Sequence, residues 1–265
     1  MVAVDHFKQA VLGFAGITIF AEPNFEGKTM ALILNIETST EVCSVSLAEN
    51  GNLLHKKEST EGMNHSRLLT VFIDELFAES NVSLKKLDAV AVSKGPGSYT
   101  GLRIGVSVAK GLCYGLGIPL ISVNSLESLG VYTAFNYTQF SEVKPESGPL
   151  FCPMIDARRM EVYTALYNAN GEEIKPISAE IITEGFLQLE LEKHPVLFFG
   201  NGAAKCKNVL THPNAIFAGP EITSAEFMQP LSDKKFQLQQ FEDVAYFEPF
   251  YLKNFVATIP KNKVF

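Results

Sequence analysis

A short apolar run, a glycine-rich loop and a helical stretch follow one another in AVAVSKGPGSYTGLRIGVSVAKGL, residues 89–112. The first four residues, 89–92, are small and apolar, which is typical of a strand buried within a sheet. The loop contains two glycines and a proline, and Thr100 is in the position of an N-cap for a helix over 101–114. A buried strand joined directly to a helix predicts an α/β fold.

Closely spaced strands precede this unit. The runs 32–37, 41–47 and 53–58 predict three strands, and Asn50-Gly51 predicts a tight turn between the last two. Apolar residues recur at helical spacing over 64–79, which predicts an amphipathic helix. The first half of the chain is therefore expected to begin with a hairpin and to continue with alternating strands and helices.

The same alternation continues beyond the glycine-rich unit. A strand is predicted over 120–123, and Asn124 with Glu127 three residues later predicts the start of a further helix, as in a capping box. Residues 133–150 are polar and contain two prolines, which indicates a connection between domains.

The second half repeats features of the first. A strand ending in a carboxylate, a Glu-Val pair and a glycine-containing turn occur in the same order at Glu37, 41–42 and 50–51, and at Asp156, 161–162 and 168–171. This repetition predicts a duplicated, hairpin-led unit, although unrelated hairpins converge on similar turns. We expect a first domain over 30–132 and a second, reduced domain with the C-terminal tail over 133–265. Residues 1–29 lack the features of a secretory signal, and we expect them to be an extension ahead of a native start at Met30.

The composition is that of an ordinary globular protein, with 46% hydrophobic and 19% charged residues among 265. A net charge of −7 argues against a protein that binds nucleic acid alone, because such proteins present a basic face. No apolar run approaches the ~20 residues of a membrane span. The four cysteines form no CxxC pair, so reduced thiols in a cytoplasmic protein are expected.

A phosphate-binding turn is one interpretation of Glu37-Thr38-Ser39, because turn amides face an anion and a carboxylate can organise magnesium. Gly97 and Ser98 precede a helix N-terminus, which is a second candidate site for phosphate. The corresponding turn of the second half contains Arg158 and Arg159, whose long side chains fill the space that a phosphate needs. The alternatives are that the turn hydroxyls satisfy local hydrogen bonds and that the glycines allow close packing of helix on strand.

No catalytic residue is predicted. The glycine-rich loop lacks the ending of a P-loop and the spacing of a dinucleotide fingerprint. The five histidines include no pair at metal-ligand spacing, and Ser98 is not in a GxSxG elbow. His65, at the start of the 64–79 helix, is expected at the surface or in a capping role.

Residues 93–105, SKGPGSYTGLRIG, resemble the signature of the TsaB (YeaZ) family. Segments 36–39, 65–69 and 156–163 agree with the family in order and spacing. The resemblance covers about 30–265. It implies the actin-like ATPase (ASKHA) fold, with two domains that each begin with a hairpin.

The catalytic paralogue of this family, TsaD, differs at a metal site. It carries Asn-His-Leu-Glu-Gly-His, whose two histidines bind a metal. This chain has Asn-Ser-Leu-Glu-Ser-Leu over 124–129, so Ser125 and Leu129 occupy the ligand positions. Because neither side chain replaces an imidazole, we expect no metal, and the glycoprotease-like (M22) label of the superfamily finds no support.

The resemblance implies a non-catalytic subunit, inactive alone, of the complex that makes threonylcarbamoyladenosine in tRNA. The subunit would dimerise with TsaD and support assembly with the ATPase TsaE, for modification of the adenosine beside the anticodon of ANN-decoding tRNAs. It would contact tRNA only within the complex, have no cofactor of its own, and form a homodimer without its partner, with ATP or ADP at the complex interface. The alternative is a free-standing small-molecule kinase or ATPase of the same fold; the missing histidines disfavour a metallopeptidase.

The resemblance also implies that pairing uses helices 64–79 and 101–114. Gly101, Gly105 and Ala109 recur every four residues, which predicts a flat face that another helix approaches. The alternative is that both helices cover only their own sheet. The expected interface residues are His65, Leu68, Leu69, Phe72, Leu76, Gly101, Gly105, Val108, Ala109 and Leu112.

On this basis, Gly105→Leu and Leu69→Glu are each expected to abolish association with TsaD while leaving the melting temperature nearly unchanged. Arg158→Ala is expected to weaken assembly, because the guanidinium fork suits a carboxylate or phosphate. Binding assays run beside thermal melts distinguish an interface from a core. Unfolding of both helix variants would place the apolar stripe and the glycines in the subunit's own core.

Overall fold

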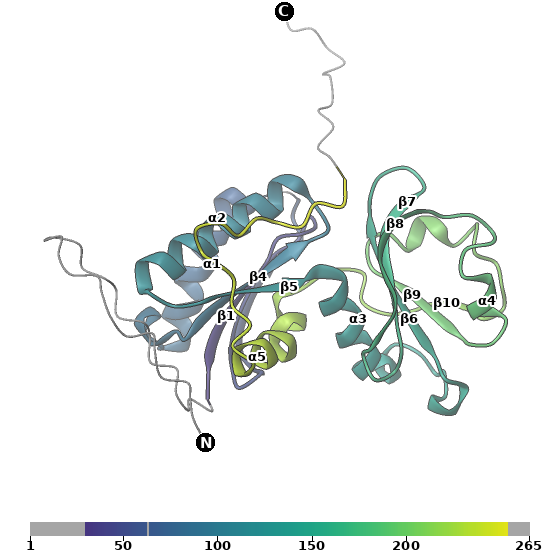
Figure 1. Cartoon of the computed structure of the whole chain (residues 1–265), viewed down its shortest axis with the longest axis horizontal. Coiled ribbons are helices and arrows are strands. Elements are labelled where there is room, and N and C mark those ends of the chain that lie inside the picture. The colour runs from purple at the N-terminus through teal and green to yellow at the C-terminus, as the bar shows by residue number, and fades with distance from the viewer. Residues whose placement is uncertain (1–29, 63, 254–265) are drawn as a thin grey trace, which may run out of the picture.

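The computed structural model describes residues 30–62 and 64–253, so the extension predicted over 1–29 lies outside the described residues. Two lobes lie next to each other along the longest axis of the molecule, each built on a five-stranded sheet (Figure 1). The chain forms the first sheet, continues into the second, and returns to the first with its last described helix.

The first sheet is a hairpin extended by parallel strands. In sheet order, β3-β2-β1-β4-β5 are Asn52–Ser59, Cys43–Glu49, Leu32–Glu37, Ala89–Gly95 and Leu120–Asn124. β1 pairs antiparallel with β2 and parallel with β4, and β4 pairs parallel with β5. All of β1 is buried, as its central position and apolar sequence predict.

Two long helices, α1 (His65–Ser80) and α2 (Tyr99–Leu116), cover one face of this sheet. The predicted N-cap of α2 is wrong, because Thr100 already lies inside the helix. Ser98 is the cap: its backbone is extended and its Oγ accepts a hydrogen bond from Gly101 N at 3.3 Å. The helix ends at Leu116 and is capped by Gly117, which takes a left-handed φ of +66° that suits glycine.

The second sheet repeats the strand order of the first. Its order β8-β7-β6-β9-β10 corresponds element by element to β3-β2-β1-β4-β5, which confirms the predicted duplication. The helices between strands are reduced to α4 (Gln188–Leu191) and a 3-10 turn, Ala204–Cys206. The strands β6 to β10 are Leu150–Asp156, Glu161–Tyr167, Glu173–Ile181, Val196–Phe199 and Ala215–Phe217.

The helix that follows each sheet packs against the sheet of the other lobe. α3 (Ser125–Asn136) comes after β5 and packs mainly on β6 and β7. α5 (Gln229–Gln237) comes after β10 and packs on β1 and β5. Residues Met228, Leu231 and Phe236 bury the face of the first sheet that α1 and α2 leave open. The two lobes therefore share their cores.

The start of α3 confirms the capping prediction. Asn124 Oδ1 accepts hydrogen bonds from Leu126 N at 2.9 Å and from Glu127 N at 3.2 Å. The helix continues through 133–136, which the composition assigned to a connection. Buried Thr133 is accommodated because its hydroxyl donates to Leu129 O, so the polar residue stays inside the helix. In the part of the chain that the structure describes, no helix is long and apolar enough to cross a membrane.

All four cysteines are buried, and burial raises the pKa of the Cys43 thiol to about 11 and those of Cys113 and Cys152 to about 12. Because the thiolate is the reactive form, we expect almost no reaction of the folded chain with DTNB at about pH 8, and complete reaction in denaturant. Rapid reaction of two or more thiols without denaturant would contradict the packing described here.

Candidate functional site

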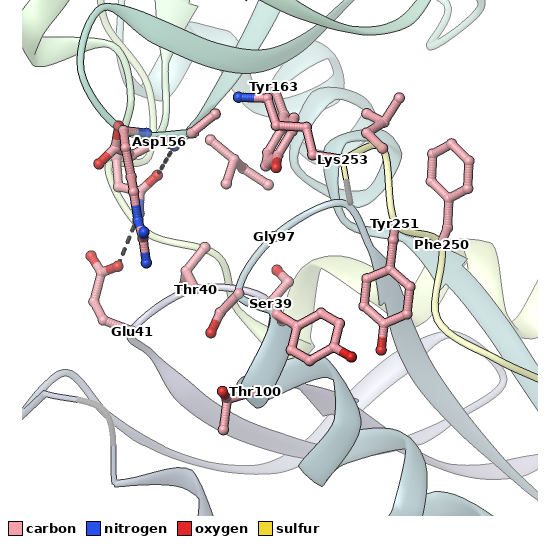
Figure 2. Close-up of a pocket in the computed structure, with 17 residues that line it drawn as sticks. Ser39, Thr40, Glu41, Gly97, Thr100, Asp156, Tyr163, Phe250, Tyr251 and Lys253 are labelled. Atoms are coloured by element: carbon pink, nitrogen blue, oxygen red, sulfur yellow. Dashed lines mark hydrogen bonds between the residues drawn. The ribbon is translucent and has the colours of Figure 1, made fainter. Parts of the chain in front are cut away.

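A cavity of about 440 Å³ lies between the lobes, where the turn after β1 faces the turn after β6 (Figure 2). Several predicted site residues come together at this cavity, namely Ser39, Gly97, Ser98 and Arg158, whereas Glu37, Thr38 and Arg159 do not line it. The remaining lining comes from Thr40, Glu41, Tyr99, Thr100, Ile155, Asp156, Ala157, Tyr163, Asn201, Phe250, Tyr251, Leu252 and Lys253.

The turn after β1 is closed over by the glycine-rich loop. Glu37, Thr38 and Ser39 are fully buried. Ser39 N donates to Glu37 Oε1 at 2.6 Å, and Thr38 N donates to Ser93 Oγ at 3.2 Å, so both amides already have partners. Ser98 N donates to Ser39 O at 2.6 Å, which holds the loop directly on the turn. A phosphate reaches these amides only if the loop moves. Among the described residues the buried Thr38 Oγ1, Ser39 Oγ and Glu37 Oε2 have no hydrogen-bond partner, so the turn's amides are satisfied within the chain but its hydroxyls are not.

Glycines make this close contact sterically feasible. A Cβ added at Gly97 would lie 2.1 Å from Ser39 O, and a Cβ added at Gly105 would lie 2.3 Å from Thr38 Oγ1. Gly101 lies equally close, since its added Cβ would be 2.2 Å from Thr38 O. The predicted flat face of α2 therefore exists but is buried against the chain's own turn. The prediction that another helix approaches this face is wrong, because Thr38 already occupies the space beside Gly101 and Gly105.

The ten predicted interface residues divide into two sets. His65, Leu69, Leu76, Gly101, Gly105 and Ala109 are buried within the first lobe. Leu68, Phe72, Val108 and Leu112 are partly buried and lie at the margin of the core. The expected surface role of His65 is also wrong, because its ring is 3% exposed and Nε2 lies 3.1 Å from Val42 O.

Residues on the outer side of the same helices were not predicted. Val71 is 46% exposed and Tyr114 is 74% exposed. Ser107 and Gly111 of α2 are also exposed, and a Cβ added at Gly111 would meet nothing within 4 Å. The helical repeat that identified the helices marks the residues facing the core, so it could not identify the outward-facing ones.

The turn after β6 presents its arginines to solvent. Arg158 and Arg159 are exposed and take left-handed φ values of +73° and +52°. Asp156 Oδ1 fixes the turn by accepting a hydrogen bond from Arg158 N at 3.0 Å, and the same carboxylate forms an ion pair with Lys205. The carboxylate that would organise a phosphate-bound cation is thus engaged with a lysine of its own lobe.

Asn201 connects the two turns across the cavity and was missed as a site residue. Its Oδ1 accepts from Asp156 N at 2.9 Å, and its Nδ2 donates to Glu41 Oε2 at 2.9 Å (Figure 2). The only signal in the sequence is an asparagine between two glycines directly after an apolar run, which fits any turn.

The α3 positions compared with the metal-binding paralogue are packed inside the protein. Ser125 and Leu129 are fully buried, and Leu129 belongs to an apolar cluster with Phe151 and Tyr167. Within residues 30–62 and 64–253, no group of three or more His, Cys, Asp or Glu side chains could hold a metal ion.

Two hairpin-led lobes of the same strand order, with a cavity between them, define an α/β protein of the actin-like ATPase (ASKHA) type. Residues 58–260 match the family model described as TsaD, tRNA N6-adenosine threonylcarbamoyltransferase. Over 236 residues the chain is 31% identical to "tRNA threonylcarbamoyladenosine biosynthesis protein TsaB" of Escherichia coli, covering 85% of this chain and 96% of that protein.

A protein of the same name from Haemophilus influenzae is 30% identical over 236 residues, covering 85% of this chain and 94% of that protein. The solved structure of YeaZ from Pseudomonas aeruginosa superposes with a TM-score of 0.69 at 25% identity, covering 84% of this chain and 100% of that chain. The chain belongs to the TsaB (YeaZ) family, which confirms the resemblance seen in the sequence.

Burial raises the pKa of the Glu37 carboxyl above its ordinary value of 4.5, and hydrogen bonds from Ser39 and Ser93 offset this only in part. The folded state therefore holds the proton more tightly than the unfolded chain, so Glu37's contribution to the free energy of unfolding falls as pH rises above 4.5. Glu37→Gln, which keeps an acceptor for Ser39 N, is expected to lessen that fall. Denaturant titrations of both proteins between about pH 5 and about pH 8 measure this pH dependence; an identical dependence in the two proteins would contradict the raised pKa of the buried carboxyl.

Proposed function

We propose that this chain is a non-catalytic subunit of the machinery that synthesises threonylcarbamoyladenosine in tRNA. The observation that carries the proposal is the packing of α3. Leu129 fills an apolar cluster at a position where TsaD-type sequences carry a metal-binding histidine, and buried Ser125 takes the place of the other. A site without either imidazole lacks the ligands for catalysis by metal, so the chemistry is assigned to a partner.

The proposed partner is the catalytic paralogue TsaD, with TsaE as the ATPase that joins the pair. The match of this chain to the TsaD family model supports a common fold. Two chains of one fold can pair through equivalent surfaces about an approximate two-fold axis, as in isologous dimers. The same surface would support a homodimer when the partner is absent.

We assign pairing to the outer face of α1 and α2, defined by Val71, Ser107, Gly111 and Tyr114. Exposed apolar and aromatic side chains beside small residues suit close helix packing, since an aromatic ring supplies contact area and a glycine leaves room for the opposing helix. The partly buried Leu68, Phe72, Val108 and Leu112 extend this surface towards the core. The buried glycine face of α2 is not part of this proposal.

In this proposal, nucleotide and tRNA bind to the assembled complex and not to the isolated subunit. The turn amides of Thr38 and Ser39 already have partners within the chain, which supports ATP or ADP at the complex interface and no cofactor of the isolated subunit. The net charge of −7 supports contact with tRNA only within the complex, which would modify the adenosine beside the anticodon of ANN-decoding tRNAs. A free-standing kinase would need an open phosphate site at the turn after β1 and is disfavoured by the loop that covers it.

Gly111→Lys provides a test in which stability and binding should change in opposite directions. The exposed position has room for a side chain, and replacing glycine within a helix should stabilise the monomer by about 0.5–1 kcal/mol. The lysine should nevertheless weaken association with TsaD at least about tenfold, or ~1.4 kcal/mol. Calorimetric titration with purified TsaD and thermal melts of the variant measure the two effects.

Val71→Glu should also weaken binding, and Leu189→Glu is its matched control because Leu189 is a 70% exposed leucine of the second lobe. Leu69→Glu and Gly105→Leu are now expected to lower the melting temperature, since Leu69 is 1% exposed and Gly105 contacts Thr38. Normal TsaD binding by both Gly111→Lys and Val71→Glu would remove this face of α1 and α2 from the interface.

A further inference from the structure

The chain beyond α5 runs along the edge of the first sheet and then to the cleft between the lobes. In Figure 1 it is the yellow segment that passes from α5 over α2. Glu242 N donates to Leu120 O at 2.8 Å, so the segment adds a bridge to the edge strand β5. We refer to residues 244–253 of this segment as the strap.

The first part of the strap is firmly attached to the first lobe. Lys110 Nζ donates to Ala245 O at 2.9 Å and to Phe247 O at 3.1 Å. Val244 and Phe247 pack against the apolar cluster beneath α1 and α2. These contacts combine hydrogen bonds to the backbone with apolar burial. This part of the strap is therefore expected to stay in place when the cleft between the lobes widens.

The second part of the strap lies at the mouth of the cavity. Phe250 N donates to Lys94 O at 2.7 Å, and an added Cβ at Gly95 would lie 2.8 Å from Phe250 O. The ring centroid of Tyr251 lies 4.8 Å from that of Tyr99, a distance typical of attractive contacts between rings. The absence of a side chain at Gly95 therefore leaves room for the backbone of the strap.

The strap then reaches the second lobe. Lys253 forms an ion pair with Glu161 at the start of β7, and its Nζ lies 5.8 Å from the centre of the Tyr163 ring. Figure 2 shows Lys253 beside Tyr163, with Phe250 and Tyr251 next to them at the cavity. Besides the exchanged helices α3 and α5, the lobes are thus connected by the strap and by the hydrogen bond between Glu41 and Asn201.

We propose that the strap is an intramolecular latch that holds the two lobes at a fixed angle and covers part of the cleft between them. Among the described residues, its far end is held by the Tyr99–Tyr251 ring pair, the backbone hydrogen bond of Phe250, contacts of Tyr251 with Arg103 and of Lys253 with Tyr163, and the partly exposed Lys253–Glu161 ion pair. Ion pairs of that kind are weak. The latch therefore opens at residues 250–253, while the attachment at Lys110 remains, and its opening widens the cavity that these residues line.

Distances between spin labels on the two lobes test this proposal in the full chain. Thr100→Cys and Ala204→Cys place labels on exposed positions of the first and second lobe, and the four native cysteines are buried. In this labelled parent, Tyr251→Ala removes the ring contact and Lys253→Gln removes the ion pair. Each should lengthen or broaden the inter-label distance, with a shift of the mean beyond about 2 Å for Tyr251→Ala.

Two tyrosine variants serve as controls. Tyr251→Phe keeps the ring and should give the distances of the parent. Tyr246→Ala makes the same truncation at a residue of the strap that is 84% exposed, and it should also leave the distances unchanged. Thermal melts verify that each variant is folded. If Tyr251→Ala does not fold, the distances in Lys253→Gln decide the outcome. Unchanged distances in every folded variant among Tyr251→Ala and Lys253→Gln would overturn the latch. The measurement needs no partner protein, so its outcome is independent of the proposed function.

Discussion

The first lobe depends on one close contact, in which the backbone of 97–105 rests on the turn formed by Thr38 and Ser39. Side chains larger than hydrogen at positions 97, 101 and 105 would occupy the same space as backbone or buried side-chain atoms of that turn. The glycines of the signature are therefore required for packing within one chain. Because the contact also fixes the orientation of α2 on the sheet, it determines which side of the helix faces outwards.

The same contact changes the character of the cleft. An actin-like fold places two turns opposite each other, yet in this chain backbone amides of both turns donate to groups of the protein itself. The first turn is covered by the glycine-rich loop, and Asp156 of the second is engaged by Lys205 and Asn201. Residues 250–253 line part of the cavity between the turns. The two facing turns of the actin-like fold are thus kept, while their amides and the Asp156 carboxylate are engaged by groups of their own lobes.

The sequence predicted the elements well because their signals are local. Apolar alternation, a helical repeat and the capping pair Asn124 and Glu127 each act over a few residues, and the strand order then confirmed the duplication. Predictions that depended on what a residue faces were less successful. A buried glycine stripe and a partner-facing one have the same spacing, so Gly105 was misassigned. His65 was misplaced because its partner, the carbonyl of Val42, is distant in sequence. Asn201 and the strap carry no repeating pattern and are defined only by contacts between distant segments.

The exchange of α3 and α5 between the lobes has a consequence for synthesis on the ribosome. The first sheet is complete once β5 has been made, but the apolar side chains of Ile33, Ala91 and Ile121 are covered from one side by Met228, Leu231 and Phe236. More than a hundred further residues must be translated before those three emerge. While those residues are being made, the nascent first lobe therefore carries an uncovered apolar face, and the packing of that face is completed only when the second lobe has also been synthesised.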